Sequence, residues 1–67
     1  MNYSVKNLIR ILEQKGFYLK RSNGSHRLYF HPHSGKTVII PVHGKKDLAS
    51  GLFFAILKQA GIDKTEI

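Results

Sequence analysis

One histidine of this chain follows a tight turn inside a strongly basic stretch. The turn is formed around Asn23, Gly24 and Ser25, and the imidazole that follows belongs to His26. Asn-Gly is a turn signal, and a glycine free to take positive φ lets backbone N–H groups approach a bulky oxyanion such as phosphate. Histidine can accept or donate a proton near neutral pH. The expected chemistry is therefore anion binding combined with proton transfer.

The charge pattern supports an anionic ligand. No acidic residue lies between Glu13 and Asp47. The cationic residues in that interval are Lys15, Lys20, Arg21, Arg27, Lys36, Lys45 and Lys46. The formal net charge is +7 and the pI is about 10.1. These values favour nucleic acid or an acidic protein as the partner over a neutral metabolite.

Two other site chemistries are less well supported. His31, His33 and His43 could bind zinc, but the chain has no cysteine and the surrounding positive charge repels a cation. Ser25 lacks a second histidine and a carboxylate placed to activate it, so a turn or hydrogen-bonding role is expected. We therefore expect no metal and no small-molecule cofactor. His43 could be a second site residue or simply part of a packed loop.

Amphipathic periodicity predicts a helix at the beginning of the chain. Ser4 can cap it, and Gly16 ends it. A stripe of apolar residues is spaced as a single buried face, formed by Val5, Leu8, Ile9 and Leu12. We expect this helix to be half-buried.

Three strands follow, over residues 17–21, 26–31 and 36–41, with turns at Asn23-Gly24 and at 32–35. Alternation in the second strand places Leu28 and Phe30 toward the core. His26 shares their parity and is expected at the rim of the sheet. The face left open would display Tyr18, Lys20, Arg27 and Tyr29. The two tyrosines could stack on bases or simply cover the sheet.

A second helix is predicted to begin with Asp47 as its cap and to end at Gly61. Its apolar residues are Leu48, Leu52, Phe53, Ile56, Leu57 and Ala60. Gly51 is costly inside a helix, which indicates close contact with another backbone element. The order of elements predicts one α+β domain over residues 1–67, with a three-stranded antiparallel sheet and both helices on one face.

Composition also indicates a compartment. The chain has no cysteine, and its apolar runs are much shorter than the roughly 20 residues that cross a bilayer. We expect a cytoplasmic protein without a membrane partner.

Several motifs resemble the HicA family of small toxins, also called YcfA-like. They are Gly16-Phe17, Arg21, Gly24-Ser25-His26, Pro41-Val42-His43, Leu48, Gly51 and the run 56–62. The resemblance implies an αβββα fold similar to the double-stranded RNA-binding domain. It also implies metal-free cleavage of mRNA and inhibition by a HicB antitoxin, with the catalytic histidine at His26.

RNA cleavage needs cations beside the charge that builds on phosphorus, and this requirement suggests which residues contact RNA. Lys20, Arg21 and Arg27 would steady phosphate around His26, with Gly24 and Ser25 forming the turn. Lys45 and Lys46 resemble the basic start of the last helix in double-stranded RNA-binding domains. They could instead be solvated, or could contact acidic residues of an antitoxin.

Three hypotheses for function follow from the sequence. The first is an mRNA-cleaving toxin held inactive by a HicB-like antitoxin. The second is a non-catalytic RNA-binding module, which would bind RNA without forming products, or an inactive HicA relative that only binds its partner protein. The third is a pure interaction partner that docks an acidic protein.

Overall fold

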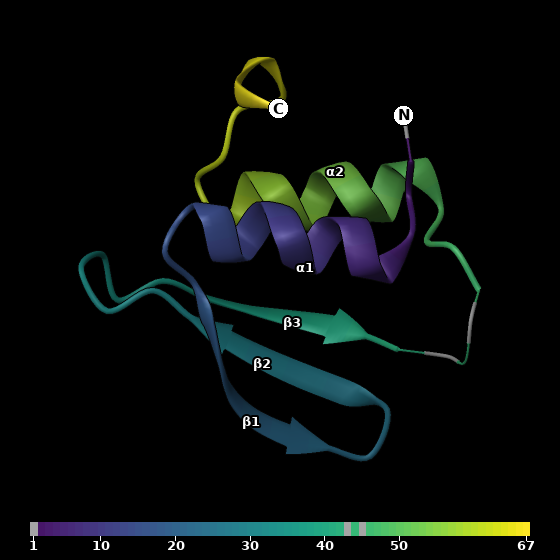
Figure 1. Cartoon of the computed structure of the whole chain (residues 1–67), viewed down its shortest axis with the longest axis horizontal. Helices are drawn as coiled ribbons and strands as arrows, with labels where there is room; N and C mark the ends of the chain where they lie inside the picture. The colour runs from purple at the N-terminus through teal and green to yellow at the C-terminus, as the bar shows by residue number, and fades with distance from the viewer. Residues whose placement is uncertain (1, 43, 45) are drawn as a thin grey trace.

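The computed structural model describes residues 2–42, 44 and 46–67. Helix α1 spans Val5–Gln14 and helix α2 spans Ser50–Gln59, with strands β1 (Tyr18–Asn23), β2 (His26–Phe30) and β3 (Thr37–Pro41) between them. A short 3-10 helix, η1, covers Lys64–Glu66. Figure 1 shows the two helices side by side, with β3 nearest to them and β1 farthest away. The predicted αβββα order and α+β class are confirmed.

Helix α1 begins and ends as its sequence predicts. The backbone N–H of Asn7 donates to Oγ of Ser4 at 3.1 Å, which satisfies one of the free donors at the helix start. Gly16, with φ of 97°, takes the left-handed conformation that lets the chain leave the helix. The face toward the sheet buries Leu8, Ile11 and Leu12.

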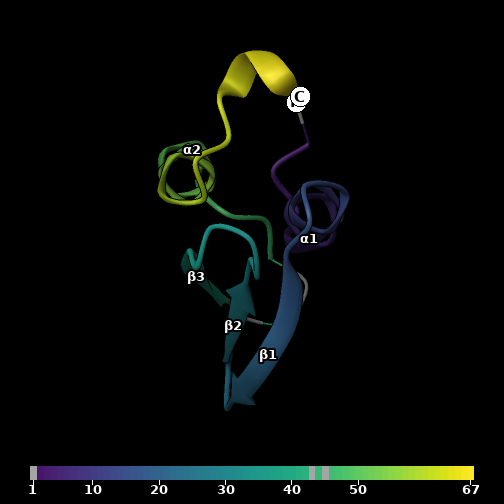
Figure 2. The ribbon, with the colours of Figure 1, turned by 90° about the vertical axis from the view of Figure 1, so that its left-hand side faces the viewer.

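The strands form an antiparallel sheet in the order β1-β2-β3. Figure 2 shows both helices on the same side of this sheet, which leaves the other side open. The core between the layers centres on side chains with almost no exposed surface, including Phe53, Leu8, Leu12 and Ile40. The predicted placement of both helices on one face is confirmed.

The predicted orientation of β2 was wrong by one residue. Tyr29 is only 3% exposed and pairs directly with buried Val38, while Arg27 pairs with buried Ile40. Directly paired residues share a face of the sheet, so Arg27 and Tyr29 face the helices. His26, Leu28 and Phe30 therefore belong to the open face.

Two features explain this error. Leu28-Tyr29-Phe30 is a continuous apolar run, so its own alternation does not distinguish the two faces. The face to which each β2 side chain belongs is fixed instead by the pairing with β3, whose Val38 and Ile40 lie in the core. Tyr29 is consequently a core residue and is not available on the open face.

Strand β1 departs from simple alternation because it carries a bulge. Its register with β2 shifts between Leu19 and Arg21, leaving Lys20 as the extra residue. Phe17 is buried just before the strand, whereas Leu19, which pairs with Tyr29, is 46% exposed. All six residues of β1 are exposed, consistent with its position at the edge of the sheet farthest from the helices.

Helix α2 begins later than predicted. Ala49 is its N-cap residue and makes no capping side-chain hydrogen bond, so the assignment of Asp47 was wrong. The N–H of Leu48 donates to the carbonyl of Tyr3 at 2.9 Å, which ties this segment to the N-terminal segment before the helix starts. Gly61, with φ of 77°, ends the helix region as expected.

Two further details concern glycine and the C-terminal segment. An added Cβ at Gly51 would meet nothing within 4 Å, so the expected close backbone contact is absent there. Residues 63–66 form an unpredicted capping box. The N–H of Thr65 donates to Oδ1 of Asp63, and the N–H of Asp63 donates to Oε2 of Glu66. No helix within the described residues is both long enough and apolar enough to span a bilayer.

Candidate active site

The β1–β2 hairpin presents His26 at its tip. Asn23 and His26 form the last pair of the ladder, so the loop contains only Gly24 and Ser25. Gly24 has φ of 60°, as expected of a two-residue hairpin loop with glycine first. An added Cβ there would meet nothing within 4 Å, so glycine is needed for its conformation rather than for space.

The third strand anchors the start of β2. The N–H of Val42 donates to the carbonyl of Ser25 at 2.6 Å, and His26 pairs with Pro41. The backbone before and at His26 is thus held from both sides. The histidine side chain itself is exposed.

A shallow depression on the open sheet face contains His26. It has a volume of about 390 Å³ and is lined by Arg21, Asn23, His26, Leu28 and Ile39. The register explains this set, because Arg21, Leu28 and Ile39 form one row across the three strands and Asn23, His26 and Pro41 form the next. Arg21 and His26 therefore lie in neighbouring rows of the same face. A guanidinium can bind an oxyanion there while the imidazole moves a proton.

Lys20 extends the positive charge along β1. Its Nζ lies 4.4 Å from the centre of the Phe30 ring, a cation–π contact. The predicted position of Lys20 on the open face is consistent with this contact, although it does not line the depression that contains His26.

Arg27 lies on the other side of the sheet, contrary to prediction. It is half-buried, and its positive charge acts on the Tyr29 hydroxyl. Burial raises the pKa of the Tyr29 hydroxyl, and the neighbouring Arg27 side chain partly opposes the rise. Arg27 cannot share a face with His26 because adjacent residues of a strand point to opposite faces.

A second basic hollow surrounds Arg27 near the start of α1. Its volume is about 380 Å³, and its cationic lining residues are Lys6, Arg27 and Lys46. Lys46 precedes α2 by several residues, so it is not at the helix start as predicted. Lys45 and His43, both sequence candidates, lie outside the described residues.

The remaining histidines occupy a different part of the molecule. His31 packs edge-on against Phe17, with ring centroids 5.0 Å apart, and its Nδ1 accepts a hydrogen bond from the N–H of Ser34 at 3.1 Å. His33 lies 5.9 Å from His31 between centroids. Within residues 2–42, 44 and 46–67, no group of three or more His, Cys, Asp or Glu side chains is arranged to hold a metal ion.

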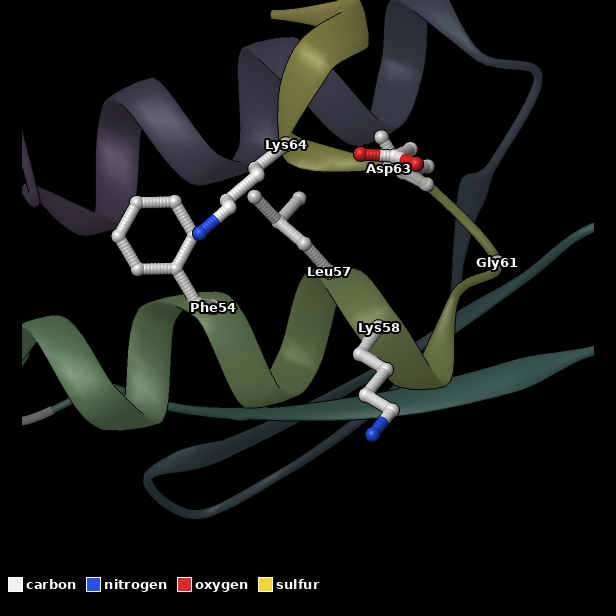
Figure 3. Close-up of a pocket in the computed structure, with 7 residues that line it drawn as sticks. Phe54, Leu57, Lys58, Gly61, Asp63 and Lys64 are labelled. Atoms are coloured by element: carbon white, nitrogen blue, oxygen red, sulfur yellow. The ribbon is translucent and has the colours of Figure 1, made fainter.

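Another hollow, of about 420 Å³, lies between α2 and the C-terminal segment (Figure 3). Phe54, Leu57 and Lys58 of α2 line it together with Asp63 and Lys64. It is separate from the hairpin and contains no histidine. We therefore place the candidate site in the depression around His26.

The structure thus brings together only some of the predicted site residues. Arg21 and His26 line one depression beside the Gly24-Ser25 turn, whereas Arg27 and Lys46 line another hollow. Sequence reasoning missed Asn23, Leu28 and Ile39 as lining residues. The Asn23–His26 pair could have been predicted from the hairpin signal. Leu28 and Ile39 could not, because their placement at the site depends on the orientation of β2.

The fold and the site define a small basic α+β domain that presents a histidine and an arginine on its open sheet face. The family model described as HicA toxin of bacterial toxin-antitoxin matches residues 5–62. The chain belongs to the HicA toxin family, as its motifs indicated, and an antitoxin is the kind of partner that this membership implies. A comparison with curated proteins found no match.

Proposed function

We propose that this toxin is an endoribonuclease that cleaves mRNA through His26 without a metal ion. The observation that carries the proposal is the exposed His26 imidazole beside Arg21, in an open depression on a positively charged chain. Family membership supports the toxin role. The reaction would take place in the cytoplasm, where mRNA is available.

In this reaction, neutral His26 accepts the proton of a ribose 2′-hydroxyl. O2′ then forms a bond to phosphorus, the bond between phosphorus and O5′ breaks, and water supplies the proton that the leaving O5′ needs. The products are a 2′,3′-cyclic phosphate and a 5′-hydroxyl. Arg21 stabilises the negative charge that builds on the phosphoryl oxygens.

The other basic residues are proposed to hold the rest of the RNA. Lys20 contacts phosphate along β1. The exposed Gly24-Ser25 turn can approach the RNA phosphate backbone near His26 with its N–H groups. Arg27 and Lys46 would contact RNA that passes around the edge of the sheet toward α1. Lys45, next to Lys46 in the sequence, is proposed to add its positive charge to the RNA contacts. These outer contacts contribute affinity that falls as salt concentration rises.

A HicB-like antitoxin is proposed to inhibit the toxin. The chain's positive charge and the long interval without acidic residues suit an antitoxin with acidic side chains at its interface. Association should therefore be fastest at low ionic strength.

The test is cleavage of purified RNA in the presence of a chelator, with analysis of the product ends. The parent chain should produce cyclic phosphate and 5′-hydroxyl ends, and addition of a HicB-like protein should stop the reaction. RNA that is bound but stays intact would instead identify a non-catalytic RNA-binding module.

A further inference from the structure

An aromatic pair occupies the open sheet face, at the opposite end of β2 from His26. Tyr18 pairs with Phe30 across the strands, and their rings meet edge to face with centroids 5.9 Å apart. Tyr18 is 47% exposed, and Phe30 is half-buried. The helices lie on the other side of the sheet, so this pair does not complete the core (Figure 2).

Apolar side chains connect this pair with the candidate active site. Leu28 lies between Phe30 and His26 on the same face of β2, and Ile39, which pairs with Leu28, is 55% exposed. At a rise of about 3.3 Å per residue, the four-residue step from Phe30 to His26 covers about 13 Å. The open face therefore combines an aromatic platform, an apolar strip and the histidine.

The charges beside this strip are complementary to a polyanion. Lys20 and Arg21 flank it from β1, and no residue of β1, β2 or β3 is acidic. The Lys20 ammonium lies over the Phe30 ring, where a base could stack. A flexible lysine can leave the ring and bind the phosphate of the incoming nucleotide.

We propose that the open sheet face binds single-stranded RNA, with a base stacked on Tyr18 and Phe30 and the scissile phosphodiester at His26 and Arg21. This inference rests on the proposed function and specifies that the RNA substrate is single-stranded. In a duplex, base faces are covered by their neighbours, whereas unpaired RNA can turn its bases onto an aromatic side chain. The preferred substrate is therefore an unpaired segment, rather than the duplex that double-stranded RNA-binding domains recognise.

The proposal is tested by binding, using His26→Ala so that the RNA stays intact. A short labelled RNA is titrated as a single strand and annealed to its complement, with affinity read from fluorescence anisotropy at low salt. The single strand should bind more tightly. Tyr18→Leu or Phe30→Leu, added to His26→Ala, should each weaken its binding by about 5- to 100-fold, the usual effect of losing one stacked base.

Phe54→Leu is the matched control, because it makes the same substitution at a partly exposed aromatic residue of α2 that lines a different hollow. It should leave RNA affinity unchanged. Thermal unfolding checks each variant, and Tyr18, which is more exposed than the half-buried Phe30, is the position where substitution should disturb folding less. Tighter binding of the duplex, or unchanged affinity in both aromatic variants, would overturn the proposal.

Two other outcomes separate this inference from the proposed function. If the parent chain binds single strands through Tyr18 and Phe30 but never cuts them, the nuclease assignment fails and the binding surface stands. If the aromatic variants keep full RNA affinity and lose only an acidic antitoxin, the face is a protein-docking surface and the inference is overturned.

Discussion

Replacing Gly24 with alanine should destabilise the hairpin that carries His26. The φ of Gly24 is 60°, and an added Cβ would meet nothing within 4 Å, so the cost comes from backbone conformation alone. A residue with a Cβ pays about 1–2 kcal/mol in the left-handed region. For a domain of this size, each kcal/mol corresponds to about 4–8 °C in Tm, so Gly24→Ala should lower Tm by about 4–16 °C.

Gly51→Ala is the matched control for this measurement. Gly51 also has free space around an added Cβ, but it lies in α2 without a positive φ. Alanine favours the helix by about 0.5–1 kcal/mol, so this variant should raise Tm. Far-UV circular dichroism during heating measures both changes.

Chemical synthesis offers a second control, because D-alanine adopts positive φ without strain. D-alanine at position 24 should keep or raise the Tm of the parent chain. Gly24→Ala should also slow RNA cleavage by shifting His26, whereas Gly51→Ala should leave cleavage unchanged. The reasoning is refuted if Gly24→Ala melts at or above the parent temperature, or if both alanine variants shift Tm in the same direction.

Three further predictions concern charge, protonation and packing. Arg21→Gln should lower kcat/KM for RNA by about 10- to 100-fold, because it removes a charged hydrogen bond to phosphate. The Tm should not change. Unchanged cleavage would show that Arg21 does not take part in the reaction. Because burial raises the pKa of Tyr29 above its usual 10.0, the folded chain holds that proton more tightly than the unfolded chain. This stabilisation is complete below about pH 10 and is lost as pH rises through the raised pKa, so Tyr29→Phe should show a shallower alkaline loss of unfolding free energy in urea titrations; an equally steep loss would contradict the assignment. Phe53 is fully buried, so Phe53→Ala should lower the free energy of unfolding by about 3–5 kcal/mol. The whole domain of 67 residues is expected to have an unfolding free energy of about 3–10 kcal/mol. A loss below about 1 kcal/mol in urea unfolding would show that the Phe53 ring does not lie at the centre of the core.

The helices and turns could be predicted because their signals are local. Ser4 caps α1 through its own side chain, and Gly16, Gly24 and Gly61 take the positive φ that their places in the pattern suggested. These features depend on residues a few positions apart, so the sequence displays them directly.

The faces of the sheet could not be predicted in the same way. Leu28, Tyr29 and Phe30 are all apolar, and the choice between the two parities depends on pairing with Val38 and Ile40 in another strand. The bulge at Lys20 also interrupts the alternation of β1. A one-residue error exchanges the two faces, which is why Arg27 and Tyr29 were misplaced together.

The wrong assignment of the two faces of β2 affects the predicted site more than it affects the predicted fold. His26 was predicted at the rim of the helix-covered face, but it lies on the open face. Arg21 lines the same depression there, and the helices do not cover it. Phe30 replaces Tyr29 as the aromatic partner of Tyr18. The open face therefore carries both the proposed chemistry and the proposed base-stacking surface.

The most direct test of the role of His26 is chemical rescue by free imidazole. His26→Ala should lose most RNA cleavage while still binding RNA, and imidazole in solution should restore part of the rate because the depression is open. Arg21→Gln, which keeps its own imidazole, should not respond. If His26→Ala cuts RNA as fast as the parent chain, or if imidazole accelerates both variants equally, proton transfer by His26 is contradicted.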